Sequence, residues 1–75
     1  FSFIIKIADL YFEDSAIMLK KRLFEEFKIT NVKIKKISKN TYRVYKGPYN
    51  NLNSIKKAFN DIKNLDFENI ELIKL

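Results

Sequence analysis

The chain has 75 residues, 47% of them hydrophobic, so it can bury one small core as a single domain. It contains no cysteine and no histidine, which excludes thiol chemistry, disulfide bonds, ordinary zinc sites and a histidine general base. The net charge of +6 and the pI near 9.6 are compatible with an anionic partner. Nearly all the basic residues are lysines, however, a bias that an AT-rich genome would impose on any protein. Charge alone therefore does not identify a partner.

The chain opens with FSFIIKI, residues 1–7, a run of β-forming residues that alternates in its first half. We expect a strand here, because alternation with a period of two is typical of a half-buried strand. Phe3, Ile5 and Ile7 would then share one face of a sheet, and Lys6 would lie on the other face.

The next segment, EDSAIMLKKRLFEEFK, changes to the periodicity of a helix. Its first residues are Glu13 and Asp14, at the end of a helix where the dipole favours negative charge. We expect a helix whose apolar face is formed by Ala16, Leu19, Leu23 and Phe27.

Two further strands are predicted next. NVKIKKI, residues 31–37, alternates again, with Val32 and Ile34 on one side. SKNT is typical of a turn, and YRVYK after it predicts a third strand that would form a hairpin with the second.

The only glycine and the only proline of the chain, Gly47 and Pro48, stand together directly after YRVYK. Glycine can take a positive φ, and proline fixes its own φ and removes a hydrogen-bond donor. We therefore expect this pair to end the third strand and turn the chain sharply into a second helix. The ring of Tyr49 would fold back under that helix.

The second helix is predicted in NNLNSIKKAFNDIKNL, with Asn50 or Asn51 as its N-cap. FENIELIKL closes the chain as a fourth strand, with Ile70 and Leu72 in phase. The apolar face of the second helix would be formed by Ile55, Ala58, Phe59 and Ile62.

The predicted order is βαββαβ, and a shift of 39 residues lays Ile5 on Val44 and Ala8 on Gly47. Two βα halves of this kind predict an α+β, ferredoxin-like or ribonucleoprotein-like fold, in which both helices cover one face of a four-stranded antiparallel sheet. The first and third strands would be central. Their outward side chains would lie on the uncovered face: Ile4, Lys6, Thr41, Arg43 and Tyr45.

The stretch YRVYKGPYNNLNSIKKAF resembles the second half of a SPOR domain (sporulation-related repeat). The shared pattern is an aromatic residue, Arg-Val, two strand residues, Gly-Pro, an aromatic residue and a helix with inward alanines. FIIKIADLYFEDSAIMLKKRL is similar to the first half of that family, so the resemblance covers almost the whole chain.

This resemblance implies a non-catalytic module that binds peptidoglycan glycan strands lacking stem peptides, and that gathers its parent protein at the bacterial division septum. It implies a periplasmic or cell-envelope location, no cofactor and no nucleic-acid partner. The sequence begins at Phe1 and shows no signal peptide or membrane-spanning run. We therefore expect residues 1–75 to be a single monomeric SPOR-like domain excised from a longer envelope protein, without membrane insertion in this segment.

The resemblance also places the glycan contacts on the open sheet face and its margins. Positions where the family has glutamine, serine and tryptophan carry Lys6, Asp9 and Thr41 here, whereas the family's arginine is retained as Arg43. Tyr45 could stack on a sugar face, and the two cations could bind carbonyls or carboxylates. The alternative is that the cations are simply solvated, that Tyr45 covers the sheet and that Asp9 is a turn or cap residue.

The alternatives to glycan binding are an enzyme, an RNA-binding module and an interaction or dimerisation domain of ferredoxin-like type, and the sequence offers no positive sign of the last. An enzyme is not indicated, because no carboxylate pair has a catalytic spacing and no phosphate-binding or nucleophile motif is present. An RNA-recognition motif shares the βαββαβ order and uses the same face, but it has Gly-aromatic at the start of its third strand rather than Gly-Pro at the end. The outward positions of the first strand carry Ile4 and Lys6 rather than an aromatic residue. RNA binding stays the alternative to glycan binding.

Overall fold

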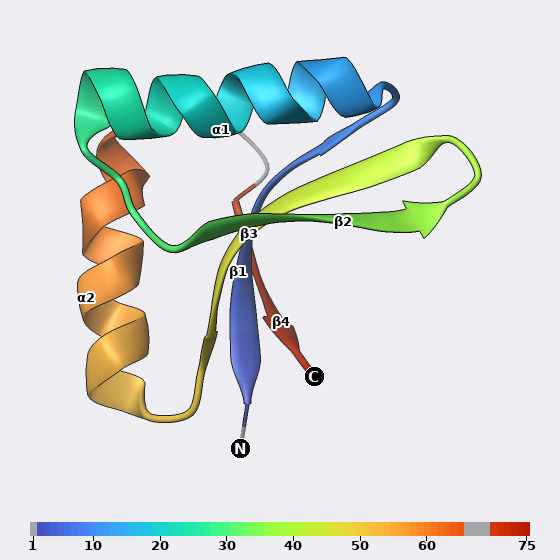
Figure 1. Ribbon diagram of the computed structural model, residues 1–75. Coiled ribbons are helices and arrows are strands. Elements are labelled where there is room, and N and C mark those ends of the chain that lie inside the picture. Colours follow the sequence, from blue (N-terminus) through green and yellow to red (C-terminus); the bar gives the residue numbers. More distant parts are fainter. Residues whose placement is uncertain (1, 66–69) are drawn as a thin grey trace.

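The computed structural model describes residues 2–65 and 70–75 and has the predicted α+β fold with βαββαβ order (Figure 1). The predicted fourth strand falls partly outside these residues, because positions 67–69 are not among them. The elements are β1 (Phe3–Leu10), α1 (Glu13–Phe27), β2 (Val32–Ser38), β3 (Thr41–Tyr49), α2 (Leu52–Ile62), the short 3-10 helix η1 (Lys63–Leu65) and β4 (Glu71–Lys74).

The four strands form one antiparallel sheet in the order β2-β3-β1-β4. The prediction that the first and third strands are central is therefore confirmed. Both helices lie on the same side of the sheet, α1 over one end and α2 along its flank (Figure 1). The other side of the sheet is not covered by any element of residues 2–65 and 70–75, and we call it the open face.

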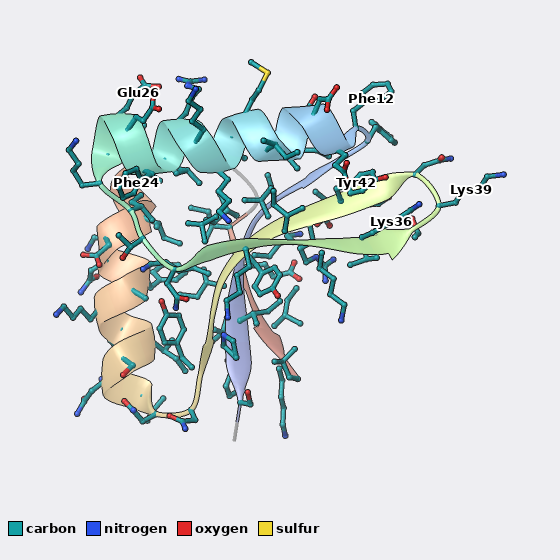
Figure 2. The ribbon with its side chains drawn as sticks, viewed as in Figure 1. Phe12, Phe24, Glu26, Lys36, Lys39 and Tyr42 are labelled. Atoms are coloured by element: carbon teal, nitrogen blue, oxygen red, sulfur yellow. The ribbon has the colours of Figure 1, made fainter. Side chains whose placement is uncertain are left out.

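The core lies between the helices and the sheet, where fully buried Ile5, Ile7 and Val44 of the central strands meet Leu23 and Ile62 of the helices. Burial of branched aliphatic side chains of this kind is the main source of stability in a small domain. Figure 2 shows Tyr42 between the β2–β3 hairpin and α1, on this same side of the sheet.

Phe27 and Phe59, predicted on the buried faces of the helices, are half-exposed instead. Phe27 is the last residue of α1, and Lys28 after it takes the left-handed conformation with φ 59°. Ile29, which follows this turn, is buried in the core. In α2 a narrower stripe contacts the sheet, and Phe59 lies on its flank. That stripe consists of Ile55, Ala58 and Ile62.

Strand β1 is longer than predicted and contains a bulge. Lys6 pairs with Tyr45, but Ala8 pairs with Val44, so Ile7 is an extra residue in β1. A bulge reverses the alternation of side chains along the rest of its strand. Ile7 and the part-buried Ala8 both lie on the helix side, and the next residue lies on the open face.

A second bulge lies in β3, and it corrects the prediction that Gly47 and Pro48 end the strand. Phe3 pairs with Tyr49 and Ile5 pairs with Lys46, so the Gly-Pro pair stands opposite Ile4 alone. The strand continues to Tyr49, and the Gly47–Pro48 peptide bond is cis. The chain turns later, at Asn51, whose side chain caps α2 by accepting a hydrogen bond from the backbone N–H of Ser54 at 2.8 Å.

The two bulges lie at neighbouring positions in the two halves of the chain, one residue apart after superposition. The 39-residue shift relates Ile7 to Lys46 and Ala8 to Gly47. It also relates Phe12 to Asn51, the N-cap residues of the two helices. Each half is therefore a strand with a late bulge followed by a helix, and the internal repeat of the sequence is a repeat of the structure.

Replacing Gly47 by alanine is expected to destabilise the domain by about 1–3 kcal/mol. The φ of Gly47 is +121°, and a Cβ there would lie 3.1 Å from Cδ2 of Tyr49 and 3.3 Å from the carbonyl oxygen of Phe3. Thermal and urea unfolding measure the loss. The exposed Asn53→Ala variant serves as the control, and equal stability of the two variants would contradict this account.

Candidate functional site

The open face is built from side chains of all four strands. Cross-strand pairing places Lys6 opposite Tyr45 and Asp9 opposite Arg43 between the two central strands. Residues that pair directly share a face of the sheet. By the same criterion, β2 adds Lys33 and Lys35, and β4 adds Glu71 and Ile73.

Arg43 and Asp9 form the strongest polar contact of this face. The guanidinium donates from Nε to Oδ1 at 2.9 Å and from Nη2 to Oδ2 at 3.0 Å. A bidentate, charge-assisted pair of this kind fixes both side chains in one orientation. It is possible only because the bulge at Ile7 turns Asp9 onto the open face.

Lys6 extends this pair into a network. Its Nζ lies 4.0 Å from Oδ2 of Asp9 and 3.8 Å from Oε2 of Glu71. Hydrogen bonds from Arg43, together with the charges of Arg43 and Lys6, hold the pKa of Asp9 below its ordinary value, although burial opposes this. The same hydrogen bonds raise the pKa of Arg43. Asp9 is therefore ionised near neutral pH.

The network changes the interpretation of three predicted site residues. Arg43 and Lys6 are not solvated cations, because their side chains are only 22% and 14% exposed and each faces a carboxylate. Asp9 is neither a turn nor a cap residue, because it lies inside β1 and holds Arg43. Two positive charges on this face are thus balanced by two negative charges, those of Asp9 and Glu71.

Next to the network lies a shallow hollow of about 190 Å³. Ile4 is 6% exposed although it lies on the open face, because the side chains around it close over it. The hollow is mostly apolar, with cations at its margin. Its lining is Ile4, Lys35, Ile37, Arg43, Tyr45, Pro48, Ile73 and Leu75.

Arg43 and Tyr45 of this hollow were predicted from the sequence as site residues, whereas Pro48 and Ile73 were not. Pro48 lies on the open face because of the β3 bulge, and the sequence periodicity does not predict that bulge. Alternation in the predicted fourth strand already places Ile73 on the face opposite to Leu72. That Ile73 lies beside Ile4 is known only from the register of β1 and β4.

Thr41 is the predicted site residue that stands apart. It begins β3 and pairs with Ser38 at the hairpin, whereas β1 pairs only as far as Tyr42. It lies on the open face by alternation, but outside the lining of the hollow. Whether it contacts a ligand stays a prediction.

One further cation lies on the opposite side of the sheet. Lys46 is 7% exposed, and its Nζ donates to the carbonyl oxygen of Thr30 at 3.0 Å, with the ring centroid of Tyr49 at 6.0 Å. The ammonium group therefore joins β3 to the loop before β2, and the side chain is buried on the helix side of the sheet. Lys46 has a structural contact there and does not reach the open face.

In residues 2–65 and 70–75, no group of three or more carboxylates is placed to hold a metal ion. None of the helices in those residues has both the length and the apolar character needed to span a bilayer. Comparison of the chain with models of protein families, with curated proteins and with solved structures found no match. Inference of function therefore depends on the chemistry of the open face.

Replacing Asp9 by asparagine is expected to lower the free energy of unfolding near neutral pH, because Arg43 and Lys6 lose their shared anion. Because the pKa of Asp9 in the folded protein lies below the ordinary value of 3.8, ionised Asp9 stabilises the folded state at pH values above 3.8. This stabilisation is lost as the pH falls through the folded-state pKa. Urea unfolding from about pH 7 to about pH 2 measures the difference between the two proteins.

That difference should be constant at neutral pH and shrink in acid, where Asp9 is protonated and resembles asparagine. Asp61→Asn, which alters an exposed aspartate of α2, is the control and should show no such trend. A difference that widens on acidification would contradict the assigned role of Asp9.

Proposed function

We propose that the open face binds an extended glycan strand, namely peptidoglycan from which the stem peptides have been removed, and that the domain is a non-catalytic, SPOR-like targeting module of the bacterial envelope. The observation that carries this proposal is the shallow, mostly apolar hollow across the sheet, bordered by Tyr45 and by Arg43. A long polymer can lie across such a surface, whereas a small substrate usually occupies a deeper cleft.

The floor and walls of the hollow suit the apolar parts of an N-acetylated sugar. Ile4, Pro48 and Ile73 offer aliphatic contacts, and Tyr45 offers a ring on which a sugar face can stack and a hydroxyl that can hydrogen-bond. Acetamido methyl groups and the C–H faces of sugar rings are the matching groups on the glycan. This pattern of an apolar base with few polar groups is typical of ligand sites.

Arg43 supplies directed donors beside this base. A guanidinium carries five N–H groups, of which the contacts with Asp9 use two. The remaining donors are held in a fixed orientation by the bidentate pair. Because the charge is already balanced by Asp9, these donors suit neutral acceptors such as acetamido carbonyls and hydroxyls.

The state of Asp9 supports a binding role rather than hydrolysis of the glycan. Asp9 and Glu71 both approach Lys6, so two carboxylates do lie on this face. A general acid in glycoside hydrolysis needs a raised pKa, but the pKa of Asp9 is lowered and both its oxygens accept hydrogen bonds from Arg43. Asp9 is therefore suited to position Arg43.

The distribution of aromatic residues favours glycan over RNA. Sheet-face RNA modules stack two or three bases on aromatic side chains of the central strands. Among the described outward residues of β1 and β3, Tyr45 is the one aromatic side chain. A single stacking position beside an aliphatic hollow fits sugars better than a row of bases.

Tyr45→Ala is expected to reduce co-sedimentation with amidase-treated sacculi roughly tenfold, as loss of an aromatic stacking contact does elsewhere. Tyr11→Ala is the matched control, because Tyr11 is 77% exposed and lies beyond the end of β1. Tyr45→Phe separates stacking from the hydroxyl group. Thermal unfolding of each variant shows whether the fold is retained.

Wild-type protein should be retained by amidase-treated sacculi and hardly by intact ones. Equal retention by both preparations would refute selectivity for peptide-free strands. Tight RNA binding that resists moderate salt, with no retention on either preparation, would replace the glycan proposal by the RNA alternative.

A further inference from the structure

The cations of the open face are of two kinds. Lys6 and Arg43, in the central strands, face the carboxylates of Asp9 and Glu71. Lys33 and Lys35, in the edge strand β2, are exposed, and no carboxylate among the described residues lies within 4.0 Å of either ammonium group.

This asymmetry follows from the order of the strands. Among the described residues, the carboxylates of the open face are those of Asp9 in β1 and Glu71 in β4, on one side of β3, whereas Lys33 and Lys35 lie on the other side. Lys33 pairs with Tyr45 and Lys35 pairs with Arg43, so both lysines border the surface proposed to hold the glycan. Lys35 itself lines the hollow.

We propose that Lys33 and Lys35 form an anion subsite for the lactyl carboxylates of the glycan strand, an inference that rests on the proposed function. Hydrolysis of the amide that joins a stem peptide to the lactyl group leaves a carboxylate on that sugar. The amide is neutral, so each removal creates a negative charge directly on the strand. Uncompensated lysines beside the binding surface recognise that charge.

The spacing of the two lysines suits a polymer with repeated charges. Residues two apart on one face of a strand are separated by roughly 6.6–6.8 Å along it. Each ammonium group ends a flexible four-carbon stem, so the two groups can follow carboxylates over a wider range than that. Arg43 lacks this freedom, because two hydrogen bonds hold it against Asp9.

The test uses two soluble ligands with the same N-acetylated backbone. Peptide-free glycan strands carry lactyl carboxylates, whereas chitin oligosaccharides carry none. Affinities are measured by NMR titration at low and at raised ionic strength. Wild-type protein is expected to prefer the glycan strand by about three- to tenfold at low salt, within the range that two exposed ion pairs contribute. The preference should shrink as salt screens the charges.

The double variant Lys33→Gln/Lys35→Gln should lose this preference while it keeps its affinity for chitin oligosaccharides. The double variant Lys33→Arg/Lys35→Arg should retain the preference, because the charge is kept. Lys56→Gln/Lys57→Gln is the matched control: it removes the same charge from two exposed lysines of α2 and should behave as wild type. Thermal unfolding checks that all variants fold.

The outcomes separate this inference from the proposed function. If wild type binds both ligands equally, or if the β2 variant keeps the full preference, the anion subsite is refuted while glycan binding stands. If the α2 variant loses the preference as fully as the β2 variant does, net charge rather than a subsite is responsible, and the inference is refuted. If wild type binds neither ligand, both proposals fail.

Discussion

The register between β1 and β3 determines which side chains this protein presents on its open face. One bulge at Ile7 and another at Gly47 and Pro48 each shift the pairing of the two central strands by one residue. Because side chains alternate along a strand, each shift moves the following residue to the opposite face. Asp9 reaches Arg43, and Pro48 reaches the hollow, only through these shifts.

The electrostatic pattern follows from that register. With Asp9 on the open face, the charge of Arg43 is balanced and its orientation is fixed, and Lys6 is held between Asp9 and Glu71. The centre of the face therefore presents an oriented guanidinium beside an apolar hollow. Among the described residues of this face, the lysines that have no carboxylate within 4.0 Å lie at the β2 margin, where their side chains are exposed. The two regions suit different parts of one ligand, neutral sugar groups at the centre and anionic groups at the margin.

Element order was predictable because each segment has a clear period and the halves repeat. The predictions failed where the alternation breaks. The pair Gly47 and Pro48 was expected to end a strand, since proline removes a donor and glycine permits a turn. In a bulge the same two properties are tolerated within the strand. Phe27 was expected in the core, but it is the last residue of α1 and half-exposed, and Ile29 beyond the left-handed turn is buried in the core.

The sequence by itself determined the α+β class, the βαββαβ order, the central position of the first and third strands and the placement of Tyr45 and Arg43 on one face. These follow from the periodicity of each segment, which its own residues determine, and from the general handedness of crossover connections. Only the tertiary structure decided that Asp9 neutralises Arg43, that Ile4 and Ile73 form part of a hollow, and which cations stay uncompensated. Those properties depend on pairing between strands far apart in the chain, and one inserted residue in either strand changes them.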